Sequence, residues 1–389
     1  MKLIYFSLDY TPHDHRFLTA IAESGHQVFY VRLQRGARQV ESRPVPPEVE
    51  IVLWAGGQKP FAWRDLPEYV LDFRRIVRRI QPDLIHAGPI QTCAFIALLS
   101  GFRPILTMSW GFDLMQDVHR GKGWEWVTRY VLKNTQYFTS DAEVTRQKAI
   151  AYGMNPARTV VFPWGVDLTH FTPKDWETSD APAAEMTHSQ NSDSAGTTHA
   201  PAELSDDWMT LFCNRAWEPI YGVDVLARAF VRVAAEIPNL RLLLVGSGSQ
   251  GNRIREILMQ GGVLERVIFP GQVRNTDLPR FYHMADLYIS PSHIDGSSVS
   301  LMEAMACGLP CLVSDIPANR EWVQEGYNGW LFRDGDDADL AAKLRQALQQ
   351  RQHLPQIGRN ARRIAEERAD WRKNVQVLLE TYQKVKEAR

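Results

Sequence analysis

The sequence predicts an α/β protein with two domains, each built around a parallel β-sheet that carries helices on both faces. The chain has 389 residues, which is more than one ordinary core supports, since domains rarely exceed roughly 250 residues. Short apolar runs alternate with helical stretches along most of the chain, and this alternation favours buried parallel strands connected by helices. One polar segment interrupts the alternation and marks the boundary between the domains.

The first half, residues 1–173, contains short apolar runs that we expect to be strands. These runs are Lys2–Leu8, His26–Leu33, Val49–Leu53, Leu84–His86, Pro104–Met108, Tyr137–Thr139 and Thr159–Phe162. Helical stretches such as Arg16–Ser24 and Glu68–Ile80 separate them. The alternation predicts an N-terminal Rossmann-like domain over residues 1–173.

The segment 174–207 lacks the residues that build a core. It carries 1 basic and 8 acidic side chains, and its large apolar residues are Trp176, Met186 and Leu204. Such a composition cannot bury enough apolar surface to offset the entropy that is lost when a chain is ordered. We therefore expect an acidic flexible linker or a surface insertion between the domains.

The alternation restarts in the second half, residues 208–365. The expected strands are Trp208–Cys213, Leu240–Val245, Val267–Phe269, Leu287–Ser290 and Cys311–Ser314. The expected helices are Val223–Glu236, Arg253–Gln260, Leu278–His283 and Ser298–Cys307. We expect a second Rossmann-like domain here and, over residues 366–389, a C-terminal helix that packs back on the first domain. Open parallel sheets bind ligands at the carboxyl ends of their strands, so the loops after strands are the candidate sites.

Composition and charge exclude several classes of protein. Hydrophobic residues make up 44% and charged residues 23% of the chain, which is typical of a globular protein. The longest uncharged apolar run, Thr92–Phe102, is far shorter than the ~20 residues of a membrane span. No secretory signal is visible before the first apolar run. Four cysteines without disulfide or metal-site spacing favour reduced thiols: Cys93, Cys213, Cys307 and Cys311. We expect a cytoplasmic protein without a nucleic-acid partner.

Four arginines give the predicted helix Glu68–Ile80 a basic face: Arg74, Arg75, Arg78 and Arg79. Such a face could make a weak peripheral contact with anionic lipid. The alternative is an ordinary solvated surface, which the pattern favours because no stripe of Trp or Phe accompanies the arginines on this helix.

The second half contains the dinucleotide-binding pattern Gly246-Ser-Gly248-Ser-Gln-Gly251 between a predicted strand and a helix. Glu265 follows at about the distance that an NAD site requires. The preceding strand, however, is the second of its domain rather than the first. A tight turn on the phosphate side of a ligand is therefore a better interpretation than an NAD site.

Two carboxylates flank the start of the predicted helix that begins near Ser298. Asp295 precedes this start and Glu303 follows it, eight positions further on. The first backbone N–H groups of a helix have no partner within the helix and lie at the positive end of its dipole, so they can bind an anion. Carboxylates beside an anion site predict a ligand with both phosphates and hydroxyls.

The run from Asp295 to Glu303 and on through Ala-Met-Ala-Cys-Gly-Leu-Pro310 resembles the signature of the retaining glycosyltransferases of family 4, which have the GT-B fold. Further family-like segments occur in the family's order and, with this run, extend over nearly the whole chain outside 174–207. They are Gln81–His86, Trp110–Asp113, Phe162–Asp167, Phe171–Pro173, Leu243–Gly248 and Ala285–Ser292. Each segment alone is a weak signal, but the ordered set is a strong one.

The resemblance implies an enzyme that moves a hexose from a nucleoside-diphosphate sugar, most simply a UDP-sugar, to a glycan, lipid or small-molecule acceptor. It implies retention of the anomeric configuration, independence of metal, and no cofactor besides the nucleotide sugar as co-substrate. The first domain would hold the acceptor and the second domain the donor. Two alternatives remain open: a GT-B nucleotide-sugar epimerase, and a nucleotide-binding scaffold subunit with weak activity.

The resemblance also implies roles for residues of the second domain. Glu303 would accept hydrogen bonds from ribose hydroxyls, Asp295 would contact the transferred hexose, and Arg215 would hold the diphosphate and stabilise the leaving nucleotide. These three form the implied catalytic set. The implied donor-binding set is Arg215, Tyr221, Gly246, Asp295, Gly296, Ser297, Ser298, Val299 and Glu303.

Departures from the family pattern concern both sides of the expected cleft. The first carboxylate of the pair is Asp295 where the family usually has Glu, and Tyr221 replaces the lysine that usually partners the arginine. Arg215 and the helix start are then left with most of the phosphate charge. On the first domain, Trp110 replaces a histidine and His13-Asp-His-Arg16 replaces a Gly-Gly turn. The acceptor or sugar side is expected to comprise Asp14, His15, Arg16, Trp110 and Asp113.

Histidines give two further choices. His13 and His15 with Asp14 could imitate a set of metal ligands, but a polar loop that faces substrate is the better interpretation, and we expect no metal. His86 ends a predicted strand and is either a core histidine or a site residue.

Overall fold

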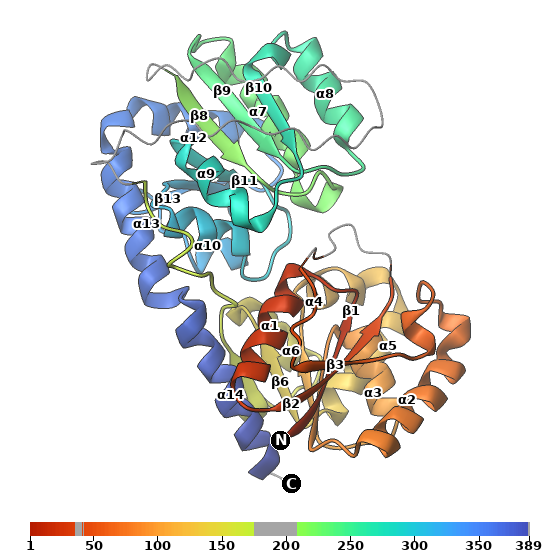
Figure 1. Cartoon of the computed structure of the whole chain (residues 1–389). Helices are drawn as coiled ribbons and strands as arrows, with labels where there is room; N and C mark the ends of the chain where they lie inside the picture. The colour runs from red at the N-terminus through yellow and green to blue at the C-terminus, as the bar shows by residue number, and fades with distance from the viewer. Residues whose placement is uncertain (36–40, 42, 175–207, 388–389) are drawn as a thin grey trace.

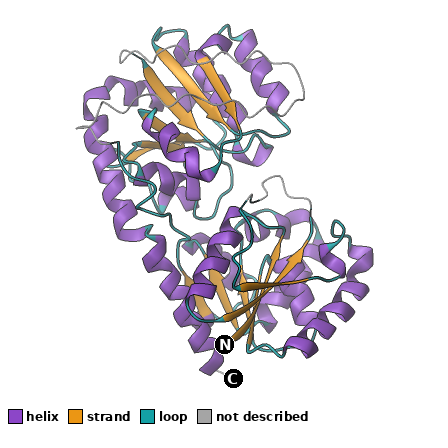
Figure 2. Ribbon diagram, in the orientation of Figure 1, coloured by secondary structure: helices purple, strands orange, loops and turns teal. Residues whose placement is uncertain are grey.

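The computed structural model describes residues 1–35, 41, 43–174 and 208–387. Two lobes, each with a β-sheet between layers of helices, lie one above the other (Figures 1 and 2). Apart from Lys174, the predicted acidic segment 174–207 lies outside the described residues. Among the described residues, no helix combines the length and hydropathy needed to span a bilayer.

The first domain contains a seven-stranded sheet in the order β3-β2-β1-β4-β5-β6-β7. Its strands are β1 (Lys2–Leu8), β2 (Gln27–Leu33), β3 (Val49–Val52), β4 (Leu84–Ala87), β5 (Ile105–Met108), β6 (Tyr137–Ser140) and β7 (Thr159–Val161). Every neighbouring pair is parallel. All the strands predicted for this half are therefore confirmed, and no end differs from its predicted position by more than one residue.

Alternate residues of β1 enter two different cores because successive side chains of a strand point to opposite faces. Ile4 and Phe6 pack on one face with α2 (Leu66–Ile80), α3 (Phe95–Leu99) and α5 (Lys122–Asn134). Leu3 and Tyr5 pack on the other face with α1 (Pro12–Glu23) and α14 (Trp371–Glu387). The remaining helices of this domain are α4 (Phe112–Met115) and α6 (Glu143–Ala151).

The second domain contains a six-stranded parallel sheet in the order β10-β9-β8-β11-β12-β13. Its strands are β8 (Met209–Cys213), β9 (Leu240–Val245), β10 (Val267–Gly271), β11 (Leu287–Ser290), β12 (Cys311–Ser314) and β13 (Gly329–Phe332). Its helices are α7 (Val223–Ala234), α8 (Gly251–Gln260), α9 (Leu278–His283), α10 (Val299–Ala306), α11 (Pro317–Arg320), α12 (Asp337–Gln349) and α13 (Leu354–Arg368). Strand β13 is not among the predicted strands. A Cβ atom at Gly329 would lie 1.9 Å from the carbonyl oxygen of Cys311, so close strand packing explains this glycine.

Both sheets reverse their strand order at the centre, between β1 and β4 in the first and between β8 and β11 in the second. The carboxyl ends of the two sheets meet at the domain boundary. Gly111 follows β5, and a Cβ atom there would lie 3.3 Å from the backbone nitrogen of Gly296, which follows β11. The loops after the strands are thus brought together, as the rule for open parallel sheets predicts.

Helix α14 leaves the second domain and lies along the first (Figure 1). A short parallel bridge joins Val166 to Asp370 where the chain crosses between the domains. Further along α14, the buried Tyr382 hydroxyl lies 2.7 Å from Nδ1 of His86, which is also buried. His86 is therefore a core histidine, and burial lowers its pKa to about 3.

We expect Leu378→Ala to destabilise the first domain by about 2–5 kcal/mol, because Leu378 is fully buried between α14 and the sheet. Glu380→Ala is the matched control on the exposed face of the same helix and should stay within about 0.5 kcal/mol of wild type. Denaturant unfolding of both variants measures the difference. Equal unfolding free energies would mean that α14 does not stabilise the domain.

Candidate active site at the domain boundary

The loop before α10 forms the centre of the candidate site. The side-chain oxygen of Ser298 caps α10 by accepting a hydrogen bond from the N–H of Leu301 over 3.4 Å. The helix is buried from Leu301 to Ala306, so packing against β11 and α13 fixes its position. The helix start therefore presents backbone N–H groups at a fixed place beside the first domain.

Arg215 and Asp295 form a direct ion pair at this helix start. The Nη2 of Arg215 lies 2.7 Å from Oδ2 of Asp295, and its Nη1 donates to the hydroxyls of Ser298 and Ser300 over 3.0 and 2.8 Å. The guanidinium lies 4.4 Å from the ring centroid of Tyr221. Burial raises the pKa of Asp295, and the Arg215 charge opposes that rise. The predicted diphosphate-binding arginine and sugar-binding carboxylate are thus adjacent.

The carboxylate of Glu303 is hydrogen-bonded to polar side chains of the second domain. Its Oε2 lies 2.8 Å from the hydroxyl of Tyr282, and its Oε1 accepts from Nδ2 of Asn275 over 3.4 Å. The amide of Asn214 donates to the Tyr282 hydroxyl over 2.9 Å. Burial raises the pKa of Glu303 to about 7. Tyr282, Asn275 and Asn214 were not predicted from the sequence, because nothing in the sequence around them indicates a functional role.

Asp141 brings a carboxylate of the first domain to the same helix start. It follows β6, is buried, and its Oδ2 accepts a hydrogen bond from the N–H of Ser297 over 2.7 Å. A Cβ atom at Gly296 would lie 2.6 Å from this oxygen, so the contact requires glycine there. Burial first, and then the Asp295 and Asp113 carboxylates, raise the pKa of Asp141 to about 7. Asp141 is not among the residues predicted from the sequence, although its place directly after a predicted strand is a signal of a site residue.

A second carboxylate joins the domains in the opposite direction. The oxygens of Glu321 in the second domain accept from the backbone N–H groups of Glu143 and Val144 over 3.1 and 3.0 Å. These groups belong to the first turn of α6, whose preceding residue makes no side-chain cap. Glu321 therefore acts as the missing cap.

Asp14 and Asp113 were expected to contact sugar or acceptor, and in the structure their carboxylates are hydrogen-bonded within the first domain. Both are fully buried. Asp14 accepts from the N–H and hydroxyl of Thr11 over 2.9 and 2.6 Å, which completes the capping box of α1. Asp113 accepts from the Ser109 hydroxyl over 2.6 Å and from the N–H of Ile90 over 3.1 Å. Each carboxylate is thus used to hold its own loop.

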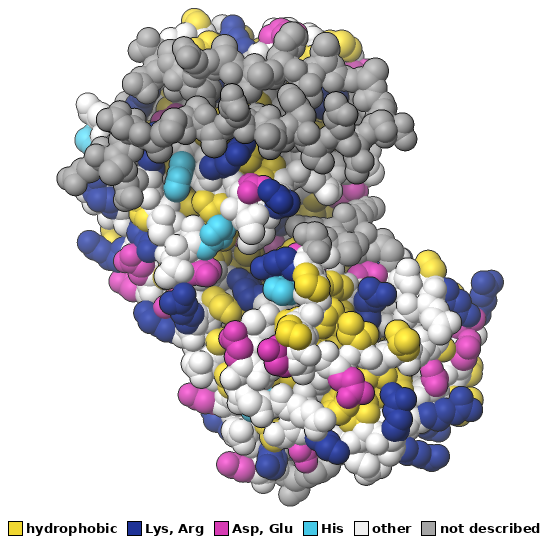
Figure 3. Space-filling model, viewed as in Figure 1, with side chains coloured by type: hydrophobic (Ala, Val, Ile, Leu, Met, Phe, Trp, Pro, Cys, Tyr) yellow, Lys and Arg dark blue, Asp and Glu magenta, His cyan; other side chains and the backbone are white. Residues whose placement is uncertain are grey.

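The other residues expected on the acceptor side make contacts within the first domain and at its crossing to the second. The Nδ1 of His15 lies 2.7 Å from the Tyr10 hydroxyl. The Trp110 ring packs edge to face on Trp164 with centroids 5.6 Å apart, and Arg16 donates to the carbonyl oxygen of Gly165 over 2.7 Å. On the face shown in Figure 3, Lys, Arg and His side chains gather where the two lobes meet.

The glycine-rich turn after β9 packs against the loop that carries Arg215. The φ angle of Gly246 is +118°, and a Cβ atom on Gly248 would lie 2.4 Å from the carbonyl oxygen of Trp217. Ser249 donates through its N–H to Oε1 of Glu218 over 2.9 Å. The glycines are therefore explained by close packing of the two loops.

Burial of Asp141 predicts a specific pH dependence of stability. Its pKa rises from an ordinary 3.8 to about 7, so the native state keeps a proton that the unfolded chain releases between these values. Stability must then fall as pH rises through this range. We expect the melting temperature of wild type to fall relative to that of Asp141→Asn between about pH 5 and about pH 8. Parallel melting curves at all pH values would contradict the assignment.

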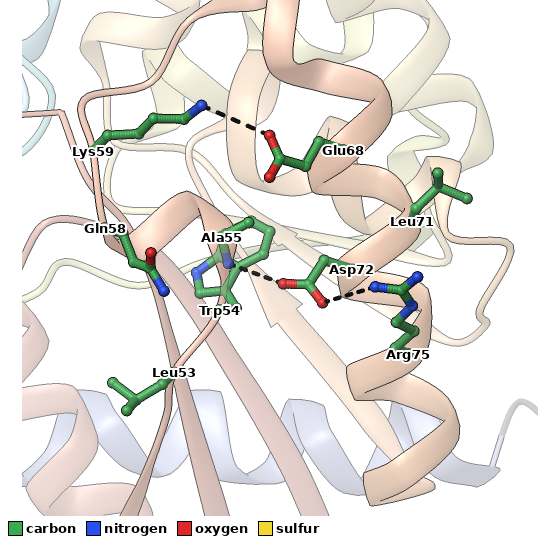
Figure 4. A pocket seen from close by; sticks show the side chains of 9 residues that line it. All are labelled: Leu53, Trp54, Ala55, Gln58, Lys59, Glu68, Leu71, Asp72 and Arg75. Carbon is green, nitrogen blue, oxygen red and sulfur yellow. Dashed lines mark hydrogen bonds and ion pairs between the residues drawn. The ribbon is translucent and has the colours of Figure 1, made fainter.

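A separate groove lies on the first domain between the segment after β3 and helix α2 (Figure 4). Its lining residues are Leu53, Trp54, Ala55, Gln58, Lys59, Glu68, Leu71, Asp72 and Arg75. Several of its polar groups are paired with one another, as in the bond of 2.9 Å from the N–H of Ala55 to Asp72. None of the predicted site residues lines this groove. Within the described residues, no three His, Cys, Asp or Glu side chains are grouped as metal ligands would be.

Comparison with known proteins identifies the class and the family. Two parallel-sheet domains with facing strand ends define the GT-B fold. The family model of glycosyl transferases group 1 matches residues 198–364, and that of the glycosyl transferase 4-like domain matches residues 13–165. The chain therefore belongs to the group 1 glycosyl transferases, family 4.

Curated relatives and solved structures agree with this family. A D-inositol 3-phosphate glycosyltransferase of Geodermatophilus obscurus is 31% identical over 250 residues, which are 62% of this chain and 50% of the relative. Spore coat protein SA of Bacillus subtilis is 26% identical over 228 residues, 57% of each chain. The chain thus spans about half the length of the curated relatives it matches.

Two solved structures share the fold over almost their full length. Sucrose-phosphate synthase from Thermosynechococcus elongatus has a TM-score of 0.79 at 18% identity and covers 100% of both chains. Anabaena HepE in complex with UDP and glucose has a TM-score of 0.76 at 17% identity, over 98% of this chain and 99% of that one. At these identities the likeness shows the fold alone.

Proposed function

We propose that this protein is a retaining glycosyltransferase that moves a hexose from a UDP-sugar to an acceptor hydroxyl. One observation carries the proposal: Arg215, Asp295 and Glu303 meet around the start of α10, at the carboxyl ends of β8 and β11. The names of the relatives, which include a phosphatidyl-myo-inositol mannosyltransferase from Mycobacterium leprae, favour glycosyl transfer. The HepE complexes with UDP and UDP-glucose favour a uridine nucleotide.

The donor would bind the second domain in three parts. The two oxygens of Glu303 suit ribose hydroxyls, and the guanidinium of Arg215 suits diphosphate oxygens, which a planar cation can hold with two parallel hydrogen bonds. Asp295 would then contact hydroxyls of the hexose. Its present pair with Arg215 would loosen as the diphosphate takes over the positive charge. The N–H groups of Ser298 and Val299 would add partial positive charge at the same place.

The reaction would break the bond between the sugar anomeric carbon and the diphosphate oxygen. The acceptor oxygen bonds to that carbon from the same face, and its proton passes to the departing diphosphate. Arg215 and the helix start would stabilise the charge that develops on the leaving group, while domain contacts fix the geometry. The absence of a covalent nucleophile from this scheme is consistent with the use of Asp295 as a binding group.

The first domain would bind the acceptor, which is a glycan, a lipid or a small molecule. Trp110 and His15 lie near the domain boundary and could contact it. The proposal places the protein in the cytoplasm, where nucleotide sugars are made. Acceptor identity is best approached by experiment, because the apolar and aromatic character of these loops suits several classes.

A peripheral contact with anionic membrane through the basic face of α2 also belongs to the proposal. Exposed tryptophans lie close to this helix although none belongs to it. Trp63 and Trp126 both pack on Phe95 of α3, with ring centroids 6.3 Å from it in each case, and Arg74 donates to the carbonyl oxygen of Leu99 at the end of α3. Aromatic rings beside cations favour a membrane interface. Sedimentation with anionic and with zwitterionic vesicles measures this contact.

Turnover of a panel of nucleotide sugars tests the function directly. Each donor is incubated with the protein and candidate acceptors, and released nucleotide is measured by mass spectrometry. Nucleotide release that depends on an acceptor supports the transferase. Conversion of the sugar without release would indicate an epimerase, and binding without turnover a scaffold subunit.

We expect Glu303→Ala to weaken UDP binding from several-fold to about a hundred-fold, since it removes charge-assisted hydrogen bonds worth roughly 1–3 kcal/mol. Glu325→Ala is the matched control, because Glu325 pairs with Lys343 on the surface of the same domain. Isothermal titration calorimetry measures both. Unchanged UDP affinity in the Glu303 variant would remove this residue from the nucleotide site.

Turnover is expected to continue in the presence of a chelator. Arginine and helix-start N–H groups would provide the positive charge that a divalent cation provides in other transferases. Initial rates before and after treatment with EDTA measure this. A loss of rate that manganese or magnesium restores would show that the proposal of metal independence is wrong.

A further inference from the structure

The guanidinium of Arg16 is the least satisfied cation at the domain boundary. Its Nη1 donates to the carbonyl oxygen of Gly165 over 2.7 Å, and its central carbon lies 4.4 Å from the ring centroid of Trp371. Its Nε and Nη2 are buried and have no hydrogen-bond partner among the described residues. A buried charged donor without a partner is costly, so a structure that retains one usually offers it to a ligand.

Two indole N–H groups of the first domain are unsatisfied as well. Nε1 of Trp164 and Nε1 of Trp110 are buried and make no hydrogen bond within the described part of the chain. The rings of Trp110 and Trp164 are 5.6 Å apart, and Gly165, which binds Arg16, is the neighbour of Trp164. The unsatisfied groups of Arg16, Trp110 and Trp164 are all donors, which predicts a ligand rich in acceptor oxygens.

Charges around Arg16 favour an anion at the boundary. Burial lowers the pKa of Arg16 to about 10, and the Glu303 and Asp167 carboxylates oppose that fall. Arg16 is therefore still a cation at neutral pH. Burial, together with the Arg16 charge, lowers the pKa of His13 to about 3, so this neighbour is neutral and competes for no anion. The influence of Glu303 places Arg16 within electrostatic reach of the second domain's nucleotide residues.

We propose that Arg16, assisted by the indole N–H groups of Trp110 and Trp164, binds a phosphate-type oxyanion from the first-domain side. This inference rests on the proposed function and deepens it: the favoured source is the donor diphosphate. Arg215 already shares its charge with Asp295, and Tyr221 contributes none, so a second cation is needed to neutralise a diphosphate. A phosphate group on the acceptor is the other source of the same chemistry.

The position of Arg16 would couple this anion to the relation between the domains. Where the chain crosses from the second domain to α14, the N–H of Val166 donates to the carbonyl oxygen of Ala369, and the carbonyl oxygen of Val166 accepts from the N–H of Trp371. Arg16 contacts Gly165 and Trp371 on either side of that crossing. An oxyanion held by Arg16 and Arg215 would touch both domains. Arg16 would therefore bind the oxyanion directly and neutralise part of its charge.

A brace of the interdomain crossing is the competing role for Arg16, and the variants are chosen to separate the two. Arg16→Met removes the charge, and Arg16→Lys keeps the charge without the planar fork. Arg372→Met is the matched control, since Arg372 also spans the crossing, donating to the Thr169 hydroxyl over 3.3 Å, but is exposed. Thermal unfolding checks that each variant is folded. If Arg16→Met does not fold, Arg16→Lys is titrated in its place.

The probes are UDP, uridine and inorganic pyrophosphate, each titrated calorimetrically. If Arg16 holds the donor diphosphate, Arg16→Met should weaken UDP and pyrophosphate about ten-fold to a hundred-fold while leaving uridine unchanged. The affinities of Arg16→Lys for UDP and pyrophosphate should lie between those of Arg16→Met and wild type. The affinities of Arg372→Met should match those of wild type. Equal loss of UDP and uridine affinity would identify a structural brace and overturn the inference. Unchanged affinity of Arg16→Met for UDP, pyrophosphate and inorganic phosphate alike would overturn it as well.

A second arm distinguishes the source of the oxyanion. Inorganic phosphate is titrated into protein saturated with UDP. Phosphate binding that Arg16→Met abolishes, with UDP affinity unchanged, would support the oxyanion site but assign it to the acceptor. If wild type binds no UDP, the proposed uridine donor fails, while pyrophosphate binding by wild type and its loss in Arg16→Met still test the Arg16 site.

Discussion

The contact between Asp141 and the loop before α10 sets the geometry of the domain boundary. A carboxylate of one domain accepts a hydrogen bond from the N–H of Ser297 in the other, at the place where a helix start binds anions. The approach is so close that Gly296 has no room for a side chain, and Gly111 lies against it from the first domain. Everything else in the candidate site is arranged around this shared backbone contact.

Burial at the domain boundary raises the pKa values of its carboxyl groups. Glu303 and Asp141 have pKa values raised to about 7, in each case mainly by loss of solvation. Such shifts are typical of functional sites, where charges are held for a ligand rather than for the stability of the empty protein. Asp14, whose pKa is also raised to about 6, is a reminder that structural carboxylates can show the same shift.

Helix α14 gives the two domains a second, independent connection. The chain passes from the first domain to the second between Trp164, which packs in a first-domain core, and Phe171, which packs in a second-domain core, and it returns near Asp370, where α14 begins its path along the first domain. Arg362 of α13 donates to the carbonyl oxygens of Phe171 and Ala306 and so holds the segment after the first crossing against α10. The orientation of the domains is thus determined by several buried hydrogen bonds as well as by the contact at Asp141.

The sequence by itself determined the fold class and most strands. Apolar periodicity reports on burial, and burial of parallel strands is a local property that short runs such as Leu240–Val245 express directly. Asp295 and Glu303 were predicted as site residues because they flank a helix start, and Arg215 because of the resemblance to the family. The short strand β13 was missed because its first residue, Gly329, is selected by contact with β12 rather than by strand propensity.

Only the tertiary structure decided which polar residues face one another. Asp14 and Asp113 have the same chemistry and the same strand-end positions as site residues, yet their oxygens are used by the backbone of their own loops. The role of Asp141 depends on Ser297, more than a hundred residues away, and that of Tyr282 on Glu303 in another helix. The unsatisfied donors of Arg16 are likewise visible only in the folded chain. The reason is physical: sequence spacing fixes which side of an element a side chain occupies, whereas its hydrogen-bond partners and its loss of solvent depend on the packing of the two domains.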